Sequence, residues 1–191
     1  MTTKKGAGFT LIELLVVIGI IAVLASMLLP AVMRAIGAAE KAQARTEVKA
    51  IENALRVYLS DYNKFPQSGS CQLQTTGAGQ TDADLINILR GINTNADANP
   101  RAFVYLDANE KSLGTNVVTA TGGQGVVGAM YDPWGNFYKI AVDYQFNNSI
   151  PNGAADGESL SARTVAVWSW GPNNKSTSPD PNDITHVRSW R

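Results

Sequence analysis

The feature that most constrains this chain is an uninterrupted apolar segment near its N-terminus. Residues 14–33, twenty in a row, carry no charged side chain. A helix rises about 1.5 Å per residue, so this segment is long enough to cross the roughly 30 Å hydrocarbon core of a bilayer. Lys4 and Lys5 precede the segment and most of the 191 residues follow it. The positive-inside rule therefore predicts a cytoplasmic N-terminus and an exported body.

The overall composition excludes several classes of function. Sixteen basic and sixteen acidic residues cancel, so there is no chain-wide basic field and we expect no nucleic acid partner. One cysteine and one histidine exclude an intrachain disulfide, a zinc site built from several Cys and His ligands, and catalysis by two histidines. No nucleophile-elbow string is present either. We therefore expect that the protein is not an enzyme.

Three interpretations of the apolar segment compete. The core helix of a soluble protein is one, but such a helix is rarely apolar on all sides. A secretory signal could be cut before Ser26, after the small residue Ala25. Against this, Glu13 lies at the start of the apolar run, where a carboxylate in lipid costs roughly 2.5–3.5 kcal/mol on insertion scales. A cleaved signal gains nothing from that charge, whereas a retained membrane helix that meets a cationic partner does.

Residues 8–13, GFTLIE, resemble the cleavage and methylation motif of type IV pilins and type II secretion pseudopilins. The resemblance implies that a prepilin peptidase cuts after Gly8 and methylates the new N-terminus at Phe9. It also implies that Glu13 serves filament assembly by pairing with the N-terminal amine of a neighbouring subunit. Pro30 lies where many pilins carry a proline.

After Pro30 the apolar pattern becomes amphipathic. One helical stripe, spaced 3 or 4 residues apart, consists of Val48, Ile51, Leu55, Tyr58 and Tyr62. We expect the opposite faces to carry the charged residues Glu40, Lys41, Arg45, Glu47, Lys49, Glu52 and Arg56. Glu52 and Arg56 form a favourable i,i+4 pair, and Pro66 ends the helical run. The pattern predicts one helix over residues 9–62, roughly 80 Å long.

The remaining residues predict a small head. Residues 67–80 are turn-like, and a short helix follows with a capping box at 81–84 and Gly91 after its end. Strands are expected at 102–106, 137–144 and 164–170, with a turn at 132–136. In the last strand Ala166, Trp168 and Trp170 share one face, and Val165 and Val167 share the other.

The expected fold class is therefore α+β, with a long N-terminal helix packed on a small antiparallel sheet, which the resemblance identifies as a pilin-like fold. We divide the chain into a leader at 1–8, the long helix at 9–62 and a periplasmic head at 63–191. Within the helix, residues 9–33 are expected to span the membrane and later to form the filament core.

The loop at 171–183 is rich in oxygen-bearing side chains, which suit a hard cation such as calcium but also any solvated turn. Segments 132–136, 169–173 and 182–184 with Ser189 and Trp190 resemble the major pseudopilin of type II secretion. That resemblance implies calcium held by the Trp170 carbonyl and by Asn173, Asn182 and Asp183, with Asp180 as a further ligand. Asparagine replaces a carboxylate at two of these positions. The alternative is a loop held by packing of the tryptophans alone.

We therefore predict a structural subunit of a helical filament, the major pseudopilin of a type II secretion system that exports folded proteins. A type IV pilus subunit for adhesion or motility is the alternative within this class, and a membrane-tethered periplasmic binding module or enzyme is the alternative outside it. The expected partners are copies of the chain, the prepilin peptidase, minor pseudopilins and the secretion assembly platform. The expected locations are the inner membrane before assembly and a periplasmic or extracellular filament afterwards, with the leader cytoplasmic.

Overall fold

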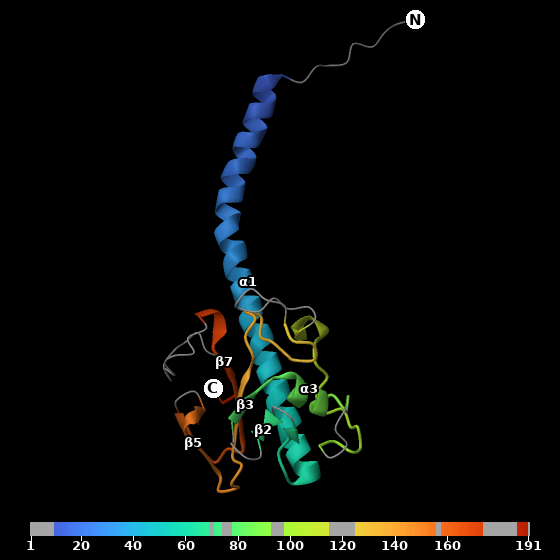
Figure 1. Cartoon of the computed structure of the whole chain (residues 1–191). Helices are drawn as coiled ribbons and strands as arrows, with labels where there is room; N and C mark the ends of the chain where they lie inside the picture. The colour runs from blue at the N-terminus through green and yellow to red at the C-terminus, as the bar shows by residue number, and fades with distance from the viewer. Residues whose placement is uncertain are drawn as a thin grey trace, which may run out of the picture. The chain divides into compact units, whose positions relative to one another are not determined.

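The computed structural model describes residues 10–68, 71–73, 78–92, 98–114, 125–155, 158–173 and 187–190. The chain divides into two compact units, residues 1–40 and 41–191. A single helix of 52 residues, α1 (Leu11–Tyr62), begins in the first unit and ends in the second (Figure 1). The long helix predicted from the sequence is thus confirmed, and Pro30 lies inside it.

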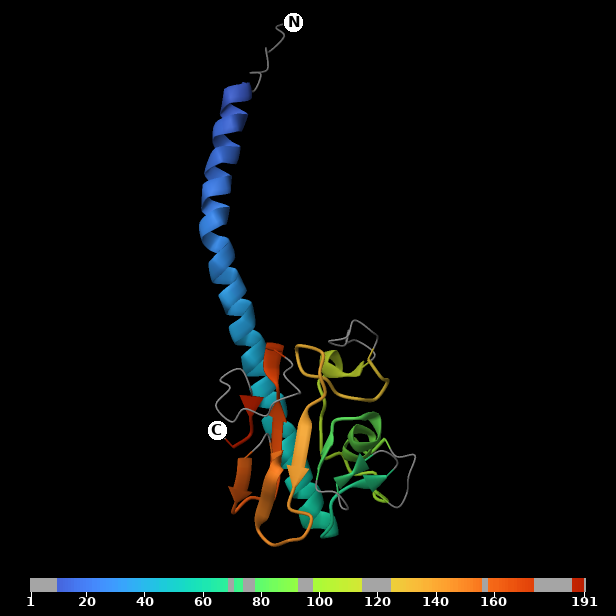
Figure 2. The ribbon, with the colours of Figure 1, turned by 60° about the vertical axis from the view of Figure 1, so that its left-hand side comes forward.

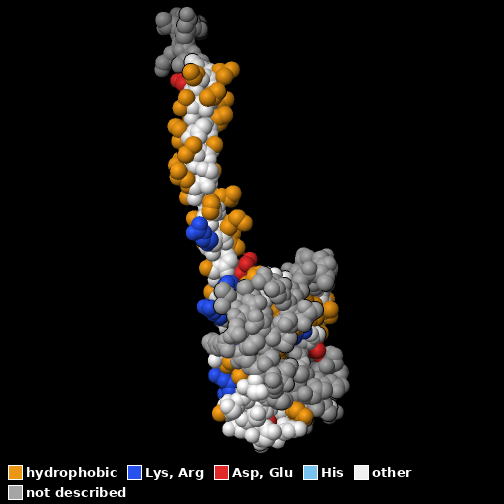
Figure 3. All heavy atoms as spheres, turned by 90° about the vertical axis from the view of Figure 1, so that its left-hand side faces the viewer, with side chains coloured by type: hydrophobic (Ala, Val, Ile, Leu, Met, Phe, Trp, Pro, Cys, Tyr) orange, Lys and Arg blue, Asp and Glu red, His pale blue; other side chains and the backbone are white. Residues whose placement is uncertain are grey.

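The first unit contains the apolar half of α1. Its large hydrophobic side chains are exposed around the whole helix, for example Met27 at 72% and Met33 at 67%. Figure 3 shows these side chains on all visible sides of the helix. By length and composition α1 is able to cross a membrane, and none of its most apolar 18-residue window is buried. This half of the helix has no apolar partner within the described residues.

In the second unit, α1 packs one side against the head. Val48, Ile51, Leu55 and Tyr58 of the predicted stripe are fully buried, and Tyr62 packs against the same core. The expectation that all charged residues face outward is wrong for two of them. Glu47 and Glu52 are only 6% exposed, because each has partners on other elements that replace water.

A four-stranded antiparallel sheet lies against this part of α1 (Figure 2). Its strand order is β3 (Ala78–Gln80), β4 (Lys139–Val142), β7 (Val165–Ser169) and β8 (Val187–Arg188). In β7, Val165 and Val167 join the core with α1, whereas Ala166 and Trp168 belong to a second cluster on the other face. The predicted alternation of β7 is therefore confirmed.

The other elements correct two expectations. Residues 67–80 are not loop throughout, because β1 (Gln67–Ser68) pairs with β2 (Cys71–Gln72) and β3 follows. Residues 102–106 form no strand: the Tyr105 and Leu106 N–H groups both donate to the Leu89 carbonyl, at the end of a helix. A second hairpin, β5 (Ser149–Ala155) with β6 (Glu158–Ser161), fills the stretch before β7.

The short helix α3 (Ala83–Leu89) is confirmed, but its cap is Asp82 and not Thr81, the first residue of the predicted capping box, because the Thr81 hydroxyl donates to the Met130 carbonyl. The Asp82 side chain caps it by accepting a hydrogen bond from the Leu85 N–H at 3.0 Å. Gly91 follows the C-cap with φ +68°, and a Cβ there would lie 2.5 Å from the Ala102 carbonyl oxygen. Only glycine fits this left-handed turn, which brings the chain after α3 back along the helix.

Candidate functional site

The start of α1 holds the residue predicted to act in assembly. The Thr10 N–H and hydroxyl donate to Glu13 Oε2 at 2.8 and 2.7 Å, and the Glu13 N–H donates to the Thr10 hydroxyl at 3.3 Å. This reciprocal arrangement is a capping box, which satisfies backbone donors at a helix N-terminus. The Glu13 carboxylate is thereby fixed at the first turn. Gly8 and Phe9, the predicted cleavage and methylation residues, lie outside the described residues.

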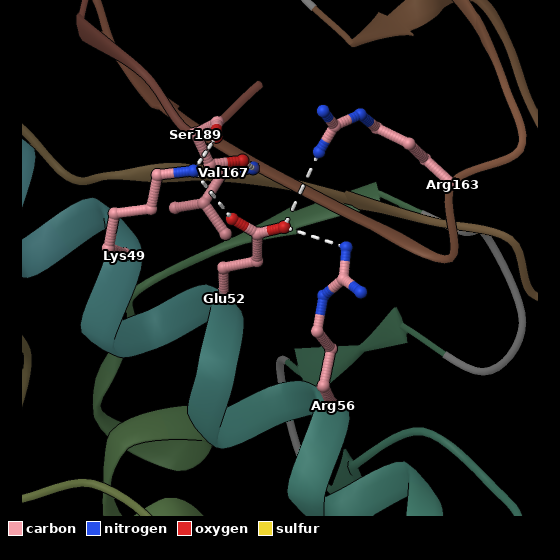
Figure 4. Close-up of polar contacts among 6 residues, drawn as sticks. All are labelled: Lys49, Glu52, Arg56, Arg163, Val167 and Ser189. Carbon is pink, nitrogen blue, oxygen red and sulfur yellow. Dashed lines mark hydrogen bonds and ion pairs between the residues drawn. The ribbon is translucent and has the colours of Figure 1, made fainter. Parts of the chain in front are cut away.

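In the second unit, a charged cluster surrounds Glu52 (Figure 4). Its Oε1 lies 2.8 Å from Arg56 Nη2 and 3.6 Å from Arg163 Nη1, and its Oε2 lies 3.5 Å from Lys49 Nζ. The Glu52 side chain is 8% exposed, whereas those of Lys49, Arg56 and Arg163 are 59%, 43% and 33% exposed. The cluster therefore combines one buried negative charge with three cations that reach the surface.

The Glu52 cluster also joins α1 to the far edge of the sheet. Lys49 Nζ donates to the backbone carbonyl of Ser189. Ser189 is held next to β7, since its N–H donates to the Val167 carbonyl at 2.9 Å and its hydroxyl accepts from the Val167 N–H at 3.1 Å. The sequence analysis predicted the pair of Glu52 with Arg56, and the i,i+3 spacing of Lys49 and Glu52 is a similar local signal. Arg163 and Ser189 are distant in sequence, so spacing did not reveal them.

A second buried carboxylate, that of Glu47, accepts hydrogen bonds from uncharged side chains. It accepts hydrogen bonds from the hydroxyls of Tyr138 and Ser112, and from Gln43 Nε2 at 3.1 Å. Burial, followed by the negative charge of Glu47, raises the pKa of Tyr138, so the phenol stays protonated and keeps donating. Glu47 thus links α1 to Tyr138, the residue before β4, and to the 3-10 turn at Glu110–Ser112. A sequence signal was available, because Glu47 lies three residues after Ala44 and four before Ile51 and so shares their side of the helix.

The turn at 132–136 is tied to the end of β7 by Asp132, which is 2% exposed. The Ser169 hydroxyl donates to Asp132 Oδ2 at 2.6 Å, and the Trp134 and Asn136 N–H groups donate to Oδ1 at 3.0 and 2.8 Å. The Gly171 N–H donates to the Ser169 hydroxyl at 2.9 Å. Burial raises the pKa of Asp132, and these hydrogen bonds oppose the shift.

This arrangement fixes Trp170, the first predicted calcium ligand. Lys139 Nζ lies 4.7 Å from the centre of the Trp170 ring, within cation–π range. Trp168 and Trp190 meet edge to face with ring centres 6.0 Å apart. The backbone continues through a 3-10 turn at Gly171–Asn173, so Trp170 and Asn173 lie in one short segment.

The other three predicted calcium ligands, Asp180, Asn182 and Asp183, lie outside the described residues. Within the described ranges, no group of three or more His, Cys, Asp and Glu side chains is placed to hold a metal. The calcium site therefore stays a prediction. What the structure adds is the hydrogen-bonded base from which the loop at 171–183 departs.

Taken together, a long apolar helix that begins with the Thr10–Glu13 capping box and a small α+β head agree with the pilin-like fold expected from the sequence. Residues 3–29 match the family described as the prokaryotic N-terminal methylation motif. The chain is 29% identical over 169 residues to type II secretion system core protein G of Aeromonas hydrophila, covering 88% of this chain and 96% of that protein. No solved structure matches the chain.

Other relatives match mainly in one region. The proteins named type II secretion system core protein G in Escherichia coli K12 and Pseudomonas aeruginosa are 45% and 37% identical over 64 and 68 residues. These matches cover 34% and 36% of this chain, and 44% and 48% of the relatives. The comparisons confirm the resemblance to the type II secretion major pseudopilin that the sequence indicated.

Proposed function

We propose that this chain is the major structural subunit of the pilus-like filament of a type II secretion system. The observation that carries the proposal is the apolar half of α1, whose side chains are exposed on every side. Each Å² of such surface costs about 25 cal/mol in water. Lipid covers this surface before assembly, and the same half of the helix in neighbouring subunits covers it afterwards.

Processing at the N-terminus prepares the subunit for assembly. The prepilin peptidase cuts after Gly8 and methylates Phe9, which removes Lys4 and Lys5 from a leader that stays on the cytoplasmic side. Support comes from the methylation motif matched at residues 3–29. The new N-terminus then lies four residues before Glu13, at the start of α1.

Glu13 directs assembly by pairing with the N-terminal amine of the adjacent subunit. Its Thr10 partners are both neutral donors, so its charge in lipid is solvated only by dipoles. A buried charge gains most from an opposite charge with good geometry. An incoming amine supplies that charge and makes extraction from the bilayer into the filament favourable.

The proposal is tested with the full chain, expressed together with its prepilin peptidase and assembly platform. Sheared filaments are quantified by electron microscopy and immunoblotting, and the subunit mass is measured. We expect a chain that begins at methylated Phe9, abundant wild-type filaments, and inserted monomers without filaments for Glu13→Ala. Glu40→Ala, the next acidic residue along α1, is the matched control and keeps filaments.

Three outcomes would overturn the proposal: a chain that begins at Ser26, no filaments from the wild type, or wild-type filament yields from Glu13→Ala. The names of the relatives favour secretion over a pilus used for adhesion or motility. Accordingly, the further partners proposed are minor pseudopilins and the secretion assembly platform. The proposed locations are the inner membrane before assembly and a periplasmic filament after it.

Calcium is the proposed ligand of the C-terminal loop. The ligands are the Trp170 carbonyl and the side chains of Asn173, Asn182 and Asp183, with Asp180 in addition. Oxygen donors of this kind are those that calcium prefers. The ion would tie the loop at 171–183 to the end of β7, where Ser169 is already anchored to Asp132.

A further inference from the structure

The second half of α1 separates its charges by sign. Of its acidic residues, Glu47 and Glu52 are buried, so they contribute little to the surface, whereas Asp61 near its end is exposed. Four cations on the outer side follow one another along the helix and define a basic flank: Lys41, Arg45, Lys49 and Arg56. An α-helix turns by about 100° per residue, so these four side chains fall within an arc of roughly 80° around the helix axis. Figure 3 shows Lys and Arg side chains along one edge of α1.

Acidic residues gather along the other side of the helix. The segment from Tyr105 to Ser112 runs beside α1, since the Tyr105 hydroxyl donates to Asp61 at 2.9 Å and Ser112 contacts both Glu47 and Gln43. Exposed between these two anchor points are Asp107 and Glu110, with Lys111 next to them. We define the acidic flank as Asp61, Asp107 and Glu110, which keeps a net negative charge with Lys111 included.

Small uncharged residues lie between the two flanks on the exposed side of α1. They include Ala42, Thr46, Ala50 and Asn53. A shallow hollow of about 500 Å³ opens here, lined by Thr46, Lys49, Ala50, Glu52, Asn53 and Arg56. Because Ala42, Thr46, Ala50 and Asn53 have short side chains, a second chain can approach this side of α1 beside the basic flank.

We propose that the basic flank of one copy binds the acidic flank of the next copy in the filament. The inference rests on the proposed function and names the surfaces by which heads meet. Surfaces of opposite sign on one chain favour a head-to-tail contact between identical copies, which repeats without closing and so builds a filament. Complementary charge also sets the register of the contact and suppresses wrong pairings.

The test reverses the charges at positions that leave the Glu52 cluster intact. One full-length variant carries Lys41→Glu and Arg45→Glu, and another carries Asp107→Lys and Glu110→Lys. Each variant alone places like charges across the contact, so we expect filament yield to fall by at least about tenfold. Lys64→Glu, outside both flanks, is the control for a charge change and keeps the wild-type yield.

Two combinations test whether the flanks meet each other. One chain that carries all four substitutions restores opposite charges at every contact and should regain filaments. The two variants expressed together should form mixed filaments that contain both chains in equal amounts, because only alternation pairs opposite charges. Both results also show that the variants fold.

The outcomes separate this inference from the proposed function. If the wild type forms no filaments, the proposed function fails and this inference fails with it. If the wild type assembles and either reversed variant assembles equally well, only the pairing of the flanks is wrong. The pairing is also wrong if neither combination raises the yield above that of the single variants.

Discussion

The Ser169 hydroxyl donates a 2.6 Å hydrogen bond to the carboxylate of Asp132, thirty-seven positions away in the sequence. The same hydroxyl accepts from the Gly171 N–H, so one side chain connects the turn at 132–136 to the start of the C-terminal loop. The carboxylate itself accepts two backbone N–H groups from its own turn. Asp132 is therefore a junction between two segments that carry the resemblance to pseudopilins.

Asp132→Asn should change the dependence of stability on pH. Burial raises the pKa of Asp132 above its usual value of about 3.9. The folded state then binds the proton more tightly than the unfolded state, so wild-type stability is lost as pH rises from about 4 through the folded pKa. The Asp132→Asn side chain still has an oxygen that accepts hydrogen bonds from the turn. It does not titrate, so the variant does not lose stability in this way as pH rises. Urea unfolding of both proteins between pH 4 and 7 should show the variant gaining relative to the wild type; parallel profiles would contradict the assignment.

Glu52→Ala should destabilise the head by about 1–3 kcal/mol. The substitution leaves three cations without their carboxylate. Breaking a fully buried ion pair costs about 3–5 kcal/mol, and we expect a smaller cost here because the cations reach solvent. Arg56→Ala, which removes one exposed cation, should cost less than about 1 kcal/mol. Denaturant unfolding measures the free-energy cost of each substitution. Equal costs would show that the buried Glu52 carboxylate contributes no more to stability than one exposed cation.

Tyr138→Phe should cost about 1–3 kcal/mol, since it removes a donor from the buried Glu47 carboxylate. Tyr144→Phe is the control, because among the described residues the Tyr144 hydroxyl accepts from the exposed Gln145 side chain and has no buried carboxylate as partner. The comparison uses denaturation midpoints at pH 7. A Tyr138→Phe protein as stable as the control would mean that water or Gln43 replaces the phenol without loss.

A chain that starts at Arg34 should be a soluble, folded monomer. Every buried residue of the core lies at Ala44 or later in the sequence, so the truncation removes apolar surface and leaves the core complete. Light scattering gives the mass, and circular dichroism with a cooperative melt gives the fold. Aggregation or a non-cooperative melt would show that the head needs residues 1–33.

Millimolar calcium should raise the melting midpoint of this truncated chain, and a chelator should reverse the effect. A ligand at a concentration equal to its Kd adds about 0.4 kcal/mol to stability, and a tenfold excess adds about 1.4 kcal/mol. Two amides among the ligands lower the charge of the site, so we expect Kd in the range of about 10⁻⁴–10⁻³ M. Asp183→Ala should abolish the shift, whereas Asp107→Ala should keep it. An unchanged wild-type midpoint would leave tryptophan packing as the support of the loop.

The long helix, α3 and the two central strands were predictable because periodicity and capping are local. The apolar stripe with Val48 and Leu55, a helix start near 81–84 and the alternation in β7 were each visible within about ten residues. The expected strand at 102–106 was wrong because its backbone donors turn to Leu89, a partner that composition does not reveal.

The polar contacts of the head were less predictable for the same reason. Glu47 and Glu52 look like surface residues in a helix with many charges. Their burial depends on Tyr138, Ser112 and Arg163, which the fold brings from more than sixty residues away. Single-sequence patterns report which side of a helix is apolar, and they do not report which polar side chains find distant partners.

The two buried glutamates have a mechanical consequence for a subunit that is pulled along its axis. Apolar side chains in van der Waals contact resist separation, yet they allow a helix to slide past a sheet at low cost. Glu47 bonds to Tyr138 and Ser112, and Glu52 pairs with Arg163, so each glutamate has directional contacts outside α1 that a shift by one turn would break. The second half of α1 is thereby locked against axial slip, so a tensile load on the helix passes to the head without shearing its core.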